Sequence, residues 1–88
     1  MRLIGKIYAG EQLLKSAQAD VIIKKDIPFN KSLDMALINI CHSLNLPNIF
    51  WLSKNSKEFS KYQQTIFSSE QFSDPVNFTQ FPIQLIED

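Results

Sequence analysis

The chain has 88 residues, 44% hydrophobic and 20% charged with two glycines, which excludes a disordered chain and predicts one folded domain over residues 1–88. Nine basic and nine acidic side chains give a formal net charge of zero, which excludes a strong overall positive field that would attract a phosphate backbone. The signs are unevenly spread, because every Lys and Arg lies within residues 2–61 and residues 62–88 carry only acids.

The first twenty-odd residues predict a β-hairpin. The segment "RLIGKIY" at residues 2–8 is typical of a strand, and Gly10 can adopt the positive φ that a tight turn requires. Along "AQADVIIK" at residues 17–24, apolar and polar side chains alternate with the two-residue period of a half-buried strand.

The clearest helical pattern follows "DIPFN", where Pro28 ends the strand and Asn30 is the expected N-cap. Asn45 can close the helix in the left-handed conformation, and Pro47 prevents its continuation. One apolar stripe with a 3.6-residue period predicts the core-facing side of this helix. It contains Leu33, Ala36, Leu37, Ile40, Cys41 and Leu44.

The apolar run "IFWL" at residues 49–52 is too short for a helix and favours a central strand covered on both faces. After it, "NSKE" has the form of a capping box, in which Asn55 caps the backbone and the Glu58 side chain reaches back. We therefore expect a short helix over residues 56–63.

The last two predicted strands are "TIFSSEQF" and "FTQFPIQLIED", separated by the turn-prone "SDPVN". Pro82 lacks a backbone donor, which favours an edge or end position for the last strand. The order β-β-α-β-α-β-β predicts an α+β fold with a mostly antiparallel sheet of about five strands. One long helix should pack on a face of this sheet, beside one short helix.

Cys41 and His42 are the only cysteine and the only histidine, and their adjacency raises the question of a nucleophile with its base. Neighbouring side chains on a helix diverge by about 100°, so this histidine cannot readily activate this thiol. Cys41 also lies on the apolar stripe, where a free cysteine usually behaves as a small buried hydrophobe. This pair therefore predicts a structural role and no catalytic one.

The sequence contains no motif that is typical of a metal or cofactor site. Asp20, Asp26 and Asp34 show neither calcium-loop spacing nor a paired-carboxylate motif, and a zinc site needs more His and Cys ligands. Two glycines also provide no Gly-rich phosphate loop. We expect no metal, no cofactor and no catalytic residue within one chain, which leaves an enzyme with a site shared between protomers as a third hypothesis.

The back of the long helix is the leading candidate site. Met35 and Ile38 lie opposite the apolar stripe, close to Lys31 and His42, where a helix on the outside of a small domain should be polar. Either a loop or the C-terminal segment covers them, or they form the apolar centre of an interface with Lys31 and His42 at its rim. The leading hypothesis is a small non-enzymatic protein–protein interaction module with a protein partner or a second copy of itself.

Sheet edges offer a second route to a partner. An open sheet has two edge strands with unpaired backbone groups. An edge that is not blocked permits strand addition or a homodimer. Lys6, Lys15, Lys24 and Pro82 are the candidates for blocking such an edge.

Nucleic-acid binding is the alternative hypothesis. A basic face of Lys54, Lys57 and Lys61 could act with stacking groups on single-stranded nucleic acid. The candidate stacking groups are Trp51, Phe59 and Tyr62. On a helix, however, Phe59 and Tyr62 point about 130° away from the lysines, so a solvated lysine face is the favoured interpretation.

A lone cysteine cannot form an internal disulfide, and the start "MRLIGKIYAG" has no signal-peptide core, which predicts a cytoplasmic protein. No apolar run approaches the ~20 residues that span a bilayer, so we expect no membrane partner. The blocks "DIPFNKSLDMALINIC", "WLSKNSKEF" and "FPIQLIED" resemble a group of short uncharacterised proteins from Gram-positive, largely anaerobic bacteria. The group has no assigned activity, so the resemblance implies a bacterial cytoplasmic protein and no functional residue.

Overall fold

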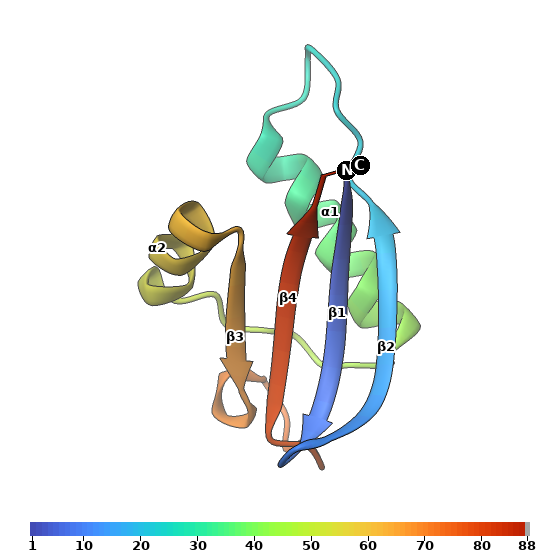
Figure 1. Cartoon of the computed structure of the whole chain (residues 1–88), viewed down its shortest axis with the longest axis vertical. Coiled ribbons are helices and arrows are strands. Elements are labelled where there is room, and N and C mark those ends of the chain that lie inside the picture. Colours follow the sequence, from blue (N-terminus) through green and yellow to red (C-terminus); the bar gives the residue numbers. More distant parts are fainter. Residues whose placement is uncertain (88) are drawn as a thin grey trace.

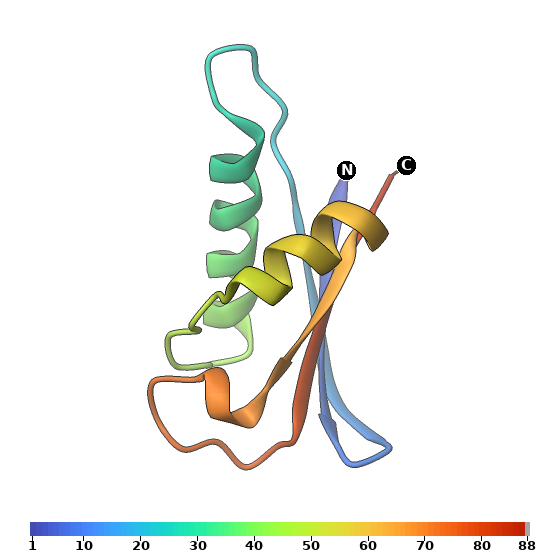
Figure 2. The same ribbon diagram turned by 90° about the vertical axis from the view of Figure 1, so that its left-hand side faces the viewer.

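A four-stranded antiparallel sheet in the order β2-β1-β4-β3 organises the chain in a computed structural model that describes residues 1–87 (Figure 1). Helix α1 packs on one face of the sheet, and α2 lies beside β3 (Figure 2). The elements are β1 (Arg2–Ala9), β2 (Gln12–Asp20), α1 (Phe29–Ser43), α2 (Ser53–Tyr62), β3 (Gln64–Ser68), the 3-10 helix η1 (Ser69–Gln71) and β4 (Gln80–Ile86). The predicted α+β class, with a mostly antiparallel sheet and two helices, is confirmed.

The predicted fifth strand at residues 49–52 is wrong. This segment crosses below α1 as irregular chain, and Ile49 forms only an isolated bridge with Phe72. Its backbone is bonded to η1 instead of a ladder, because the Phe50 N–H donates to the Gln71 carbonyl at 2.6 Å. Phe50 and Leu52 are about half exposed, so this apolar segment is not a strand buried on both faces.

The N-terminal hairpin is confirmed as β1 and β2. Gly10 has the predicted left-handed φ of 62° in the turn between them. Leu3 and Ile7 of β1 are buried under α1, and Ala17 and Ala19 of β2 pack beside them. The register shifts once, between Ile7 and Tyr8.

The position predicted for Pro82 is also wrong, because β4 lies in the middle of the sheet between β1 and β3. Pro82 is opposite Ile66 of β3. On the other side, the described β1–β4 pairing runs to Gly5 opposite Ile83 and resumes only at Tyr8 opposite Gln80. The ladder is interrupted where proline has no N–H to donate, and the burial of the neighbouring Ile83 holds the strand in place nonetheless.

The apolar stripe of α1 faces the sheet as predicted. Leu37, Ile40 and Leu44 are buried in the core. The helix ends at Ser43, and Asn45 just beyond it has a left-handed φ of 57°. The next N–H, that of Leu46, donates to the Cys41 carbonyl at 2.8 Å. The expected N-cap, Asn30, is wrong, since the helix begins at Phe29 and no side chain caps it.

Gly5 sets the distance between α1 and the sheet. A Cβ atom at this position would lie 2.8 Å from both Cγ2 of Ile40 and Cε1 of Phe81, and both of those side chains are fully buried. Real Cβ atoms do not approach carbon so closely, so any larger residue must push α1 away or displace the Phe81 ring.

We predict that Gly5→Ala lowers the free energy of unfolding by about 1–3 kcal/mol, the usual cost of overpacking a core. Urea denaturation followed by circular dichroism measures this change. Gly10→Asn is the matched control, because its site has open space and asparagine tolerates positive φ. An alanine variant as stable as the wild type would contradict the close approach.

Helix α2 starts earlier than predicted, and the expected capping box is wrong. Leu52 is the N-cap, and Asn55 occupies the third helical position, where its Oδ1 accepts from the Leu52 N–H at 3.0 Å. Glu58 does not cap the helix either, because its carboxylate accepts a hydrogen bond from the Thr65 hydroxyl at 2.6 Å. The Asn55 side chain points into the protein, where it bonds residues of β3 and η1.

Asn55 is 0% exposed and joins α2, β3 and η1 through its carboxamide. Its Nδ2 donates to Thr65 Oγ1 at 2.8 Å and to the Ile66 carbonyl at 3.4 Å. Its Oδ1 also accepts from Gln71 Nε2 at 2.9 Å. No buried side-chain nitrogen or oxygen within residues 1–87 lacks a hydrogen-bond partner, so this polar cluster is fully satisfied.

We predict that Asn55→Ala lowers the free energy of unfolding by about 3 kcal/mol, because it leaves buried partners without a hydrogen bond. Chemical denaturation measures the loss. Asn39→Ala, at an exposed position of α1, should change stability by less than about 0.5 kcal/mol. Equal effects of the two substitutions would show that the buried amide does not hold the segments together.

Candidate interaction surface on helix α1

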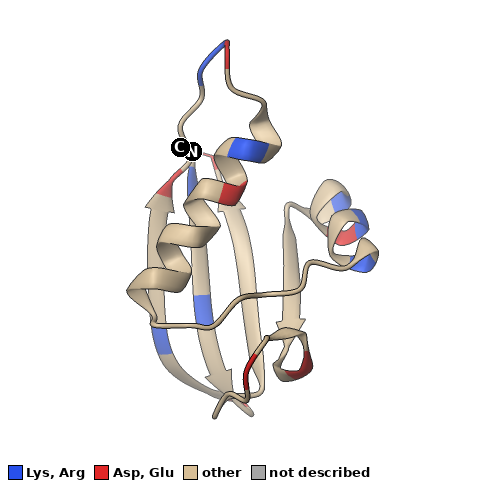
Figure 3. Ribbon diagram, turned by 180° about the vertical axis from the view of Figure 1, so that it is seen from behind, with Lys and Arg blue, Asp and Glu red and all other residues tan. Residues whose placement is uncertain are grey.

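The four residues predicted for the interface all lie on the exposed side of α1, away from the sheet. Met35 is 48% exposed and Ile38 50% exposed, and Lys31 and His42 are exposed beside them. Figure 3 looks onto this side of the molecule and shows that charged Lys and Asp segments of α1 lie only in its first half. The structure therefore brings the four predicted residues together on one face, which we call the α1 face.

Nothing within residues 1–87 covers the α1 face. The two covers expected within the chain were a loop and the C-terminal segment. The described C-terminal residues instead form β4 inside the sheet, and the loop at residues 46–52 runs along one flank of α1. Two large apolar side chains consequently remain open to solvent.

A groove follows the flank of α1 next to this face. Two adjoining clefts of about 430 and 280 Å³ share Asp34 and Leu37 and together form what we call the α1 groove. Lys31 lines the first cleft, whereas Ile38 and His42 line the second. Three of the four predicted residues thus border a groove of mixed polar and apolar lining that sequence reasoning did not anticipate.

Trp51 forms the far wall of the first cleft. It was predicted in the core of a strand, but it is 38% exposed. Its ring meets the buried rings of Phe59 and Phe67 edge-on, with centroids 6.1 and 5.4 Å away. Its Nε1–H donates to Ser56 Oγ at 2.7 Å, so the indole is held rigidly with one side toward the groove.

The polar cluster around Asn55 holds the backbone on both sides of Trp51. Gln71 Nε2 donates to the Phe50 carbonyl at 3.1 Å, and the Leu52 N–H donates to Asn55. The groove wall is therefore pinned by buried hydrogen bonds that come from η1 and α2. A sequence offers no signal for such contacts, because Asn55 and Gln71 are separated by 16 positions.

Cys41 and His42 lie in different surroundings. Cys41 is half-buried against the core, and burial raises the pKa of its thiol to about 11. The thiol is therefore protonated near neutral pH and is a poor nucleophile. His42 points to the exposed side of the helix, as the divergence of neighbouring side chains predicts.

The lysine face predicted for nucleic acid is exposed on α2. Lys54, Lys57 and Lys61 are all in contact with solvent, and basic segments of α2 are visible in Figure 3. Of the proposed stacking groups, Phe59 is buried in the core. Tyr62 is exposed, with the Lys61 ammonium 5.3 Å from its ring centroid.

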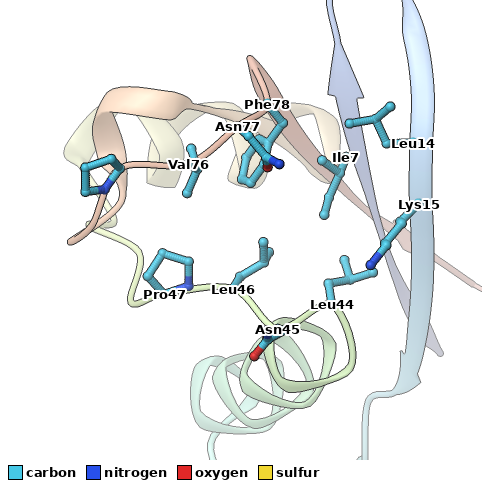
Figure 4. A pocket seen from close by; sticks show the side chains of 11 residues that line it. Ile7, Leu14, Lys15, Leu44, Asn45, Leu46, Pro47, Val76, Asn77 and Phe78 are labelled. Carbon is cyan, nitrogen blue, oxygen red and sulfur yellow. The ribbon is translucent and has the colours of Figure 1, made fainter.

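A further cleft lies between the C-terminal end of α1, the β1–β2 hairpin and residues 75–78 (Figure 4). Its volume is about 630 Å³, and Ile7, Leu44 and Phe78 form its apolar floor. Lys15 is the only charged residue in its lining, with no carboxylate, imidazole or thiol to perform acid–base or nucleophilic chemistry.

Residues 1–87 contain no group of three or more His, Cys, Asp or Glu side chains arranged to bind a metal. Neither α1 nor α2, the helices of the described chain, has the length and apolar character to cross a membrane. No protein-family model, curated protein or solved structure matches the chain. The functional assignment therefore depends on the surfaces of the molecule itself.

Proposed function

We propose that this protein is a small, non-enzymatic protein–protein interaction module that binds its partner through the α1 face and the α1 groove. The observation that carries the proposal is the exposure of Met35 and Ile38 on the side of α1 that no described segment covers. Contiguous exposed apolar side chains mark interaction surfaces, and Met35 and Ile38 lie next to each other on one face of the helix.

The surface has the composition of an interface. The apolar part of the groove includes Leu37, which lines both clefts, Trp51 in the first cleft and Ile38 in the second. Tryptophan is enriched among the residues that dominate binding energies. Lys31 and His42 surround this centre as a polar rim. A partner with two or three apolar side chains on one helical face would fill the groove and bury both exposed residues.

We predict that Ile38→Glu or Met35→Glu abolishes retention of the partner, with at least a roughly tenfold loss of affinity, because a charge would be buried at the centre of the interface. Immobilised wild-type and variant proteins are compared for the proteins that they retain from a lysate of the source organism, by quantitative mass spectrometry.

Ile66→Glu is the matched control, since Ile66 is 48% exposed but lies on the opposite face of the sheet. A partner retained equally by the wild type and by both α1 variants would contradict the assignment of the α1 face. Circular dichroism of each variant excludes unfolding as the cause of a loss.

Nucleic-acid binding through α2 is the second candidate function. It is supported by the shared exposure of Lys54, Lys57 and Lys61 and by the exposed Tyr62 ring beside them. Three lysines with one aromatic group make a modest single-strand site, and the zero net charge adds no long-range attraction.

If α2 binds nucleic acid, a fluorescent single-stranded oligonucleotide should bind at about 50 mM salt and dissociate as salt rises, because binding releases counterions. Fluorescence anisotropy measures this change. Replacing the three lysines with glutamine should remove the binding, whereas Lys24→Gln and Lys25→Gln in the loop after β2 should not. Absence of binding at low salt would eliminate this function.

A further inference from the structure

The two edges of the sheet differ in how their backbones are satisfied. Strand β3 has five residues, α2 packs beside it, and the Asn55 side chain donates to the Ile66 carbonyl on its outer side. Strand β2 has nine residues, contains no proline, and pairs with β1 alone within the described chain. Seven of its nine side chains are exposed and the other two are half-buried.

The hydrogen-bond phase of β2 identifies the groups that point outward. The Val21 N–H donates to the Met1 carbonyl at 2.9 Å, in register with Leu3 opposite Ala19. Antiparallel pairs alternate between bonded and non-bonded positions, so Ala17 and Ala19 also direct their backbone groups toward β1. Three residues between and beside them direct both N–H and C=O to the open edge. They are Ser16, Gln18 and Asp20.

We propose that this edge binds the β2 strand of a second copy of the chain, antiparallel and about a two-fold axis, to form a continuous eight-stranded sheet. The proposal goes beyond the α1 partner proposed above, because it uses a different surface of the domain. An extended strand is the one occupant that satisfies a row of outward N–H and C=O groups at once.

The apolar side chains near β2 favour a second copy over an unrelated strand. Leu13 and Leu14 at one end of the strand are each nearly half exposed, and Ile22 and Ile23 just beyond the other end are more than half exposed. In an antiparallel two-fold pair, the end of β2 with the two leucines lies beside the isoleucines of the other copy, and the symmetry repeats this contact at the other end of the interface. The exposed leucines and isoleucines would thus cover each other.

Leu14 connects this edge with the large cleft. In Figure 4, the Leu14 and Lys15 side chains lie on the β2 side of the cleft, opposite Val76 and Pro47. A second copy lying along β2 would bring its exposed Ile22 and Ile23 close to the end of the strand that carries Leu14. The cleft and the open edge then form one surface.

The preferred register places Gln18 opposite Gln18 of the second copy. The alternation of β2 is regular from Lys15 to Asp20 and breaks at Leu14, where the register with β1 shifts. Within this regular part, an axis at Ser16 or Ala17 leaves the outward groups of Asp20 without an outward partner among the three outward-directed residues. The axis at Gln18 pairs all three, and it puts the Ser16 hydroxyl opposite the Asp20 carboxylate, which it can hydrogen-bond.

The oligomeric state is the direct test. Light scattering should give twice the chain mass of 10.2 kDa for the wild type across a roughly hundredfold range of concentration. Ser16→Pro removes an outward N–H and should give the monomer mass with an unchanged circular dichroism spectrum, because proline is tolerated at a free edge. Ser16→Ala keeps the N–H and should remain dimeric.

Cysteine cross-linking tests the register in a Cys41→Ser background. Gln18→Cys should form a disulfide-linked dimer under mild oxidation, because opposite Cα atoms in an antiparallel pair lie about 5.5 Å apart. Ser16→Cys should not, since the two copies of position 16 would be about 14 Å apart along the strands. Cross-linking at position 16 but not at 18 would overturn the register.

A wild-type chain that is monomeric at every concentration would overturn the proposal, as would a dimer that Ser16→Pro leaves intact. Binding of a foreign strand to β2 in a monomeric chain would also overturn it. These outcomes are separate from the α1 face, because Ile38→Glu should leave the dimer mass unchanged. A monomer that still retains an Ile38-dependent partner would reject only the β2 pairing, and a dimer that retains none would reject only the α1 partner.

Discussion

The arrangement of α2, β3 and η1 depends on one interaction, the hydrogen bonding of the buried Asn55 carboxamide. This carboxamide is fully enclosed, and both of its polar atoms are bonded to segments that lie ten or more positions further along the chain. A buried amide without partners would cost more than most single contacts contribute, so α2, β3 and η1 must assemble together around it. Their relative placement follows from satisfying one side chain.

These hydrogen bonds affect two surfaces of the molecule, the α1 groove and the β3 edge of the sheet. The hydrogen bonds around Asn55 hold the backbone on either side of Trp51, which makes the wall of the α1 groove rigid before any partner arrives. The same side chain bonds the Ile66 carbonyl and helps to close the β3 edge. The sheet is therefore asymmetric, with one satisfied edge and one open edge at β2.

Helix α1 links the candidate surfaces. Gly5 allows its core side to lie directly on β1 and β4, which commits one stripe of the helix to the sheet and leaves Met35 and Ile38 outside. Because α1 lies so close to the sheet, the sheet fixes the position of the outer face of the helix and of the groove beside it. The proposed protein binding on this face and the proposed strand pairing at β2 involve different sides of the same domain.

The sequence by itself determined the elements whose signals are local. Alternation with Gly10 specifies the hairpin, and a stripe of 3.6-residue period ending at Asn45 specifies α1, including the outward position of Met35 and Ile38. Tertiary structure alone decided that residues 49–52 are not a strand, that Pro82 lies in a central strand, and that Asn55 is a buried residue inside α2 instead of its N-cap. The bonding partners of those segments are distant in the chain, so no local pattern carries the information.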